Sequence, residues 1–240
     1  MRDLRLLTVV SALAFMALGF TSPVMTVYLE SLGASFAQIS LIMTTFTLTA
    51  LLTNYASGWL SDKARRRKPL LVGGLLLMAF AYFWLARVLD ATQAWPLRIL
   101  EGIGSGAYGT LSLAMTGDLL EDSNRRGRIM GILRGIGSVA FAVGAVAGGW
   151  LSTRLAAPSV FIAAGSCYAA AALVMAAVRE HQRPAAVNEH EPLGAPTGYV
   201  GLGLPLLFLA GVFLWTSAGG AFTSMWANAM THAGYSQQTI

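Results

Sequence analysis

Long apolar stretches separated by short polar segments dominate the chain. The stretches lie at about 6–28, 36–60, 70–89, 94–119, 129–153, 158–178 and 200–227. A helix of about 20 mostly apolar residues crosses the hydrocarbon core of a bilayer. Because these stretches are continuously apolar and do not alternate with polar residues, they favour spanning helices over spanning strands. The pattern predicts an all-α membrane protein with seven spanning helices.

The composition supports this interpretation. The chain is 55% hydrophobic and 11% charged, whereas a soluble domain carries about 25% charged residues. These few charges cannot cover the surface of a soluble domain of this length, so much of the surface is expected to face lipid. The single cysteine, Cys167, lies inside an apolar stretch and is interpreted as a small packing residue. The first stretch is too long for the apolar part of a signal peptide and is interpreted as a retained span.

Basic residues gather in alternate loops. Most of the 16 Lys and Arg residues lie before the first span, between the second and third, between the fourth and fifth, or after the sixth. The other loops are short and nearly uncharged. Positively charged loops stay in the cytoplasm, so the sequence predicts a cytoplasmic N-terminus in a multi-pass protein of a plasma membrane or bacterial inner membrane.

The chain divides into a six-helix part and a shorter one. Residues 1–178 are predicted to form a six-helix bundle, and the proline-rich segment 179–199 reads as a flexible cytoplasmic linker. Residues 200–240 are interpreted as the first helix of an incomplete second bundle. An internal repeat supports this division, because Gly19, Gly33 and Ser35 recur in the same spacing as Gly220, Gly234 and Ser236.

The loop between the second and third spans carries the most specific motif. It reads Gly-Trp-Leu-Ser-Asp-Lys-Ala-Arg-Arg-Arg-Lys from Gly58 to Lys68 and resembles the cytoplasmic signature loop of the major facilitator superfamily. The matching positions include Gly58, Asp62, Lys63, Arg66 and Arg67, whereas Arg65 replaces the usual glycine. The resemblance implies a conformational switch, with close helix approach at Gly58 and a carboxylate at Asp62 that pairs with cations or a helix N-terminus. A plain basic loop would explain the arginines but not the spacing of Gly58 and Asp62.

The fourth span holds a second motif. Arg98, Glu101 and the following glycines resemble the Arg-x-x-Gln-Gly-x-Gly motif of the same family, with Glu101 in place of glutamine. Arg98 and Glu101 lie three residues apart on one helical face, which Ser105 and Ser112 continue. One hypothesis makes this face a cavity lining with Glu101 as the proton-coupling group. The other makes Arg98 and Glu101 a structural ion pair near the outer membrane interface.

Two further groups of residues are expected to shape the bundle. Gly144, Gly148 and Gly149 resemble part of the family's fifth-helix glycine motif and are predicted to pack closely against another helix. Ala145 stands at that motif's proline position, which weakens an assignment to antiporters. Asp118 and Arg134 are predicted either to form a cytoplasmic charge pair or to leave Arg134 extended to the membrane surface.

The resemblance implies half of a twelve-helix fold, in which two six-helix bundles enclose a substrate site. The leading hypothesis is proton-coupled efflux of small organic molecules by alternating access. Uptake of a sugar, nucleoside or other metabolite is the alternative, and a non-transporting fragment or membrane scaffold is a third. The expected partners are a small-molecule substrate, the lipid bilayer and the C-terminal half of the same protein, with no nucleic acid. No enzymatic activity, metal or cofactor is expected, and a proton gradient is the expected energy source, since no phosphate-binding loop is evident.

Overall fold

Seven helices, α1 to α7, lie within residues 2–176, further helical residues are described near the C-terminus, and the described residues contain no strand. The computed structural model describes residues 2–64, 66–120, 123 and 125–179, and towards the C-terminus residues 210, 211, 214, 219 and 229–234. The predicted linker after Arg179 and nearly all of the predicted seventh span lie outside the described residues. The helices are α1 (Arg2–Thr21), α2 (Met25–Ser31), α3 (Phe36–Ala64), α4 (Lys68–Leu85), α5 (Ala91–Leu119), α6 (Arg126–Leu155) and α7 (Ala157–Ala176).

The spans predicted within residues 1–178 correspond to these helices. The first predicted span is interrupted after α1 by a turn that contains Pro23, whose ring removes a backbone donor, and α2 then continues it. Five segments are long and apolar enough to cross a membrane: Arg2–Ser31, α3, α4, α6 and α7. The other long helix, α5, is less apolar because it contains Arg98 and Glu101. The predicted all-α membrane fold is confirmed.

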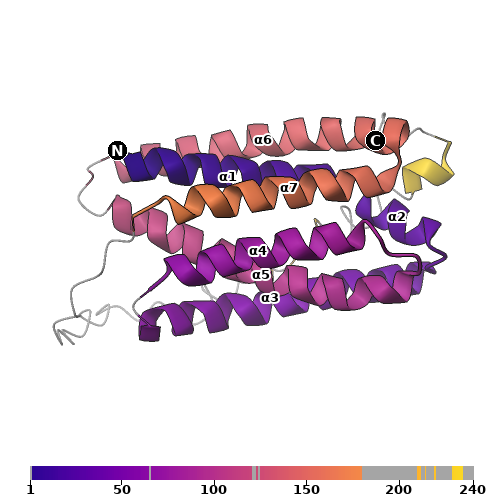
Figure 1. The fold of residues 1–240 in the computed structure, drawn as a ribbon, viewed down its shortest axis with the longest axis horizontal. Coiled ribbons are helices and arrows are strands. Elements are labelled where there is room, and N and C mark those ends of the chain that lie inside the picture. The colour runs from indigo at the N-terminus through magenta and orange to yellow at the C-terminus, as the bar shows by residue number, and fades with distance from the viewer. Residues whose placement is uncertain are drawn as a thin grey trace.

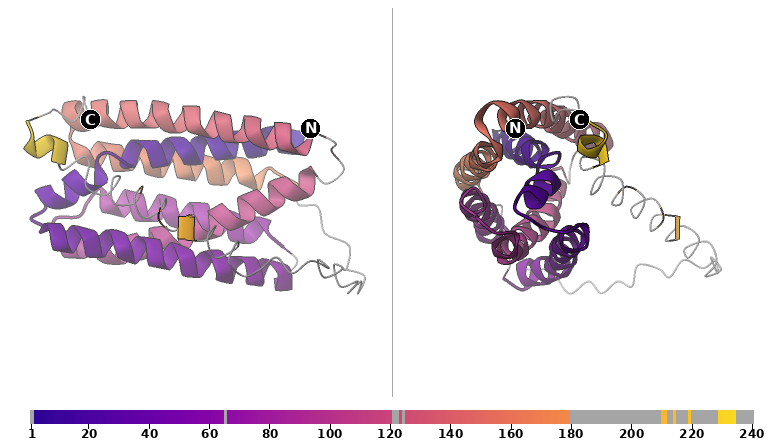
Figure 2. Two further views of the ribbon diagram at one scale, coloured as in Figure 1. Left: turned by 180° about the vertical axis from the view of Figure 1, so that it is seen from behind. Right: turned by 90° about the vertical axis from the view of Figure 1, so that its right-hand side faces the viewer.

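The six long helices pack as an open row. The order across the row is α3, α5, α4, α7, α1 and α6, because each neighbouring pair in this sequence makes extensive contact. Figure 1 shows α1, α6 and α7 as one group of three and α3, α4 and α5 as the other. The right panel of Figure 2 shows the same helices end-on. Among the five apolar segments, α3 and α6, at the two ends of the row, are the least buried. In the most apolar 18-residue stretch of each, 11% is buried inside the bundle.

Glycines bring the helices of this row close together. Gly144 and Gly148 of α6, which were predicted to be packing positions, lie against α1, and a Cβ atom at either would overlap the carbonyl oxygen of Met16 or Phe20. Gly149 is also buried. At the other end of the row, a Cβ atom on Gly106 of α5 would lie 2.5 Å from the carbonyl oxygen of Ala50 on α3. Small residues of this kind let the backbones of membrane helices approach each other.

Side chains satisfy backbone groups at the helix ends. Lys68 Nζ donates a hydrogen bond to the carbonyl oxygen of Ala176 at the end of α7 (2.6 Å), and Arg126 Nε donates one to Leu120 after α5 (2.7 Å). These cations lie where the helix dipole places partial negative charge. We call this end of the bundle, where α3, α5 and α7 finish and α4 and α6 begin, the basic end.

The opposite end of the bundle has its own helix caps. The hydroxyl of Tyr28 on α2 donates to the carbonyl oxygens of Leu85, the last residue of α4, and of Val88 beyond it, at 3.1 Å each. Asp90 caps α5 by accepting a hydrogen bond from the amide of Thr92 at 2.7 Å. The hydrogen bonds from Thr92 lower the pKa of Asp90 from its ordinary value.

Candidate functional site

A buried ion pair lies inside the bundle. Arg98 and Glu101 of α5 are 3% and 4% exposed, and Arg98 Nη1 pairs with Glu101 Oε2. Their spacing of three residues places both on one helical face, as the sequence predicted. Arg98 lies seven residues into α5, or about 10 Å from its start at the rise of a helix. The pair is therefore set into the bundle from the end opposite the basic end.

Glu101 also accepts a hydrogen bond from a second helix. The hydroxyl of Tyr82 on α4 donates to Glu101 Oε1, so each oxygen of the carboxylate has its own donor. The Tyr82 ring stacks on the Tyr168 ring of α7, with centroids 5.5 Å apart and planes within 10°. Thr21, at the end of α1, places its hydroxyl 3.4 Å from that of Tyr82. We call Arg98, Glu101, Tyr82, Tyr168 and Thr21 the Glu101 network, which joins four helices.

On the side facing α3, the Arg98 guanidinium contacts an aromatic ring and a thioether sulfur. The guanidinium lies over the ring of Phe46, 4.2 Å from the centroid, and Nη2 lies 3.5 Å from the sulfur of Met43. Cation–π contact and a thioether replace only part of the hydration that a guanidinium loses on burial. Arg98 Nε is buried without a hydrogen-bond partner among the described residues. Glu101 is therefore the main group that compensates the charge of Arg98.

This arrangement makes the two buried charges depend on each other. A membrane-buried carboxylate that holds an arginine is a group whose neutralisation changes the local charge by one unit. If Glu101 bound a proton, Arg98 would lose its counter-ion while still buried, and the side chains around it would have to rearrange. Tyr82 and Thr21 would carry that change to α4 and α1. The described residues contain no cluster of three or more His, Cys, Asp or Glu side chains that could hold a metal ion.

The predicted polar face of α5 continues from Glu101 towards the basic end. Ser105 and Ser112 are both half-buried, and Ser112 donates its hydroxyl to the carbonyl oxygen of Gly109 at 3.4 Å. Nearby, Thr110 donates to the side chain of Asn54 on α3 at 2.8 Å. Ser105 and Ser112 therefore lie between the protein interior and an open face of α5.

At the basic end, Arg67 ties the signature loop to α5. Arg67 pairs with Asp118 near the end of α5, and its Nη2 lies 3.8 Å from Asp62 Oδ1. The Asp62 side chain is 70% exposed, and Arg66 is also exposed. The structure thus pairs Asp118 with Arg67, and the predicted pair with Arg134 is wrong. Arg134 is exposed on α6, and its extension to the membrane surface stays a prediction.

Two other residues of the signature loop, Lys63 and Gly58, lie on α3 itself. The Lys63 ammonium is 5.0 Å from the centroid of the Trp59 ring, a cation–π contact at the surface. Gly58 was expected to permit close helix approach. Within the described bundle, a Cβ atom at Gly58 would meet only the methyl of Thr110, at 3.7 Å, which is an ordinary contact. The described helices therefore do not require glycine at this position.

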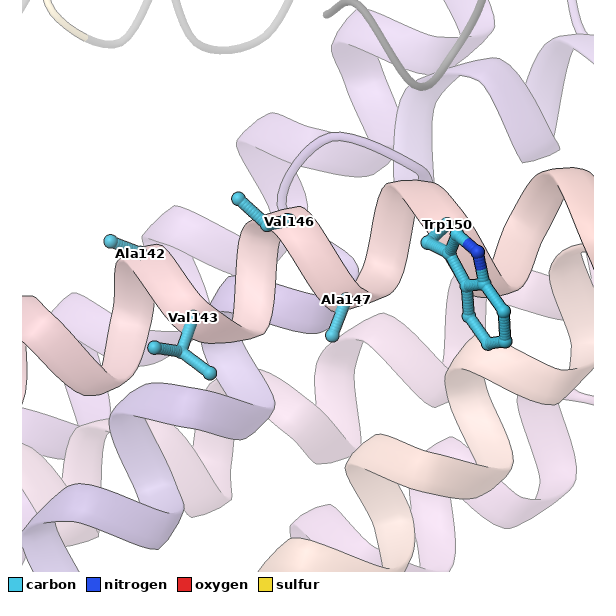
Figure 3. A pocket seen from close by; sticks show the side chains of 5 residues that line it. All are labelled: Ala142, Val143, Val146, Ala147 and Trp150. Carbon is cyan, nitrogen blue, oxygen red and sulfur yellow. The ribbon is translucent and has the colours of Figure 1, made fainter.

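An apolar hollow lies on the outer face of α6. Figure 3 shows the five side chains that line it, all from this helix: Ala142, Val143, Val146, Ala147 and Trp150. Val146 and Trp150 are 77% and 52% exposed. The lining of the hollow is apolar, and the hollow is separate from the Glu101 network.

Sequence reasoning missed three members of the Glu101 network. Tyr82, Tyr168 and Thr21 lie in apolar stretches and belong to no recognised motif. The available signal was that a buried tyrosine hydroxyl needs a polar partner, and Glu101 is one of the few buried polar side chains that can provide one. The sequence did not indicate which tyrosines reach it, because that depends on how α4 and α7 pack against α5.

Comparison with known proteins gives a consistent result. The sequence profile described as Major Facilitator Superfamily matches residues 7–240. The chain is 25% identical over 222 residues to multidrug resistance protein 1 of Bacillus subtilis (strain 168), covering 92% of this chain and 56% of that protein. It is 27% identical over 132 residues to multidrug resistance protein MdtL of Shewanella sp. (strain ANA-3), covering 55% of this chain and 33% of the relative.

A solved structure shows the same fold. The POT family transporter PepTSo superposes with a TM-score of 0.62 at 14% sequence identity, covering 94% of this chain and 52% of that one. The matched regions of the three proteins thus span a third to about half of their lengths.

Proposed function

The chain belongs to the Major Facilitator Superfamily, and on this premise we propose that it forms the N-terminal half of a secondary transporter that exports small organic molecules by alternating access. In this proposal the basic end faces the cytoplasm and the proton gradient supplies the energy. The main observation in support of this proposal is the Glu101 network. It buries a carboxylate and an arginine in a membrane bundle and connects them to three other helices.

The cost of these charges favours a functional role. A charged residue at the centre of a membrane helix costs about 2.5–3.5 kcal/mol on insertion scales. Mutual pairing of Arg98 and Glu101 offsets part of this cost, but well-packed apolar residues of similar volume would avoid it. A purely structural bundle gains nothing from the pair that apolar packing could not supply. A proton-coupled carrier, by contrast, needs a carboxylate whose charge can change within the membrane.

The proposed coupling follows from the contacts of Glu101. With Glu101 ionised, Arg98 and Tyr82 both donate to it, and α4 and α5 are held together at this point. A proton on Glu101 removes the counter-ion of Arg98, which then needs another acceptor. Rearrangement of Arg98 and Tyr82 would loosen the contacts among α1, α4, α5 and α7. This change is the proposed link between proton binding and the shift between inward-open and outward-open states.

The direction and the substrate class rest on the similar proteins. Two of them carry the name multidrug resistance protein, and a third is quinolone resistance protein NorA of Staphylococcus aureus, 24% identical over 140 residues, covering 58% of this chain and 36% of that protein. Apolar side chains are exposed along α3 and α6, where either lipid or an amphipathic compound could contact them. Amphipathic cations and quinolones are therefore the first substrates to test.

The test is an efflux assay in cells that express the gene with its complete reading frame. Cells are loaded with a fluorescent lipophilic cation or a quinolone, and efflux is followed between about pH 6 and 8, the range in which a proton-coupled step responds. Glu101→Gln is expected to lower efflux at least tenfold and to flatten its pH dependence. Asp90→Asn, which removes an exposed carboxylate, is the matched control and should leave efflux unchanged.

Two results would count against the proposal. Normal pH-dependent efflux by Glu101→Gln would remove Glu101 from the coupling mechanism. Uptake of a sugar or nucleoside without export of any compound in the panel would favour the uptake alternative.

A further inference from the structure

The two copies of the internal repeat end in the same backbone conformation. At Gly33 the chain leaves α2 with φ of +86°, and at Gly234 it leaves the C-terminal helical segment with φ of +89°. In both copies the glycine N–H donates to the carbonyl three residues earlier, at 2.9 and 3.0 Å. The preceding residue donates to the carbonyl four residues earlier, at 3.1 and 3.0 Å. This positive φ suits glycine, so both positions have the same requirement.

These two repeat ends touch each other. His232 Nε2 lies 2.7 Å from Glu30 Oε1, and the rings of His232 and Phe36 have centroids 5.7 Å apart at an angle of 58°. Figure 1 shows the C-terminal segment, in yellow, beside α2 at the end opposite the basic end. The side chains of His232 and Glu30 are 61% and 29% exposed. The contact joins the first span to residues that follow the predicted linker, so it bridges the first bundle and the second repeat.

Other charged groups at this end leave the pair intact. Arg154 lies in the last turn of α6, and Arg87 and Asp90 lie between α4 and α5. None of these three described residues forms an ion pair with His232 or Glu30. Phe36, the first residue of α3, contributes only its ring. Glu30 is therefore the charged partner that the structure records for His232.

We infer that Glu30 and His232 form a latch that closes this end of the molecule between the first bundle and the second repeat, and that the latch holds best when the imidazole carries a proton. Histidine is the side chain whose charge ordinarily changes between pH 5 and 8. A protonated imidazole forms an ion pair with the carboxylate, whereas a neutral one can only donate a hydrogen bond to it. Water reaches both side chains, so a proton can enter and leave without any larger opening.

In the proposed alternating access, the latch is the contact that closes the end opposite the basic end. This role rests on the proposed function. The latch itself can be tested without a transport assay, because its opening changes the distance between α3 and the C-terminal segment. In the purified 240-residue chain, with Cys167→Ser, spin labels are placed at Ala37→Cys and Ala233→Cys. Both positions are exposed beside the contact. Pulsed electron paramagnetic resonance then gives the distribution of distances between the labels.

The parent chain is expected to show a short distance that predominates at about pH 5.5 and loses population at about pH 8.5. The ratio of long to short distances should rise about two- to five-fold, the effect of an exposed ion pair. Glu30→Gln and His232→Gln should each remove the pH response. Arg154→Gln, which removes a charge at the same end without touching the pair, should retain it.

A chain with Glu30→His and His232→Glu together restores the pair in reverse and should restore the pH response, even if a single variant folds poorly. A distance distribution independent of pH in the parent, or an unchanged response in Glu30→Gln, would overturn the latch. Failure of the efflux assay with a normal pH response would instead overturn the proposed transport and leave the latch standing.

Discussion

The energetic coupling between Arg98 and Glu101 is open to a direct test. Both side chains are nearly fully buried, and each is the main charge partner of the other. Removing one partner of a buried pair costs about 3–5 kcal/mol, because the remaining charge stays in a low-dielectric site without compensation. Arg98→Met and Glu101→Gln should therefore each destabilise the bundle by about that amount. The double variant removes both charges together and should cost far less than the two single costs combined.

The assay is a double-mutant cycle on the purified chain in mixed micelles, with unfolding followed by circular dichroism as the fraction of denaturing detergent rises. We expect a coupling energy of at least about 2 kcal/mol. This exceeds the average of about 0.6 kcal/mol for neutral hydrogen bonds between membrane helices, because two charges lose their compensation. Additive effects, within about 0.5 kcal/mol, would show that Arg98 and Glu101 do not depend on each other and would refute the account of the Glu101 network.

Three shorter predictions follow from the helix contacts and the helix caps. Gly106→Ala should destabilise the chain by about 1–3 kcal/mol through overpacking, whereas Gly58→Ala should stabilise it by about 0.5–1 kcal/mol; the same unfolding assay gives the two opposite signs. Arg67→Gln should cost about 1.5–3 kcal/mol by removing a charged hydrogen bond to α5, and Arg66→Gln, at an exposed neighbour, should stay within about 0.5 kcal/mol. Because the pKa of Asp90 is lowered in the folded chain, its contribution to stability is present above the carboxyl's unfolded pKa and is lost as the pH falls through the folded value. Asp90→Asn should therefore weaken the acid dependence of unfolding below about pH 4.

Hydrophobic patterning predicted the helices well because burial in lipid and burial in protein both select apolar residues. The break after α1 was the main omission, and Pro23 was its visible signal. What the pattern could not give was the order of helices across the row. Composition is nearly uniform around each helix, so the apolar stripe that identifies the buried face of a soluble helix is missing here.

The motifs placed the site residues on the correct elements but did not identify their partners. Arg98 and Glu101 were recognisable because both lie on one helix, where spacing alone determines which side chains meet. The partner of Asp118 was not recognisable, because Arg67 reaches it from a different element across the basic end. Glu30 and His232 are even further apart in sequence, and neither belonged to a motif. Contacts within a helix follow from the sequence, whereas contacts between helices depend on the packed bundle.

The two ends of the bundle now carry different kinds of charge pairs. At the basic end, Arg67 holds a carboxylate of α5, and arginine keeps its proton at any physiological pH. At the opposite end, the partner of Glu30 is the imidazole of His232, which forms an ion pair with the carboxylate only when it is protonated. If the proposed latch depends on the charge of His232, a change of pH weakens this end while leaving the basic end intact. In the proposed transporter, which alternates between closure at its two ends, the proposed latch would let protons favour one closed state over the other, separately from the coupling proposed for Glu101.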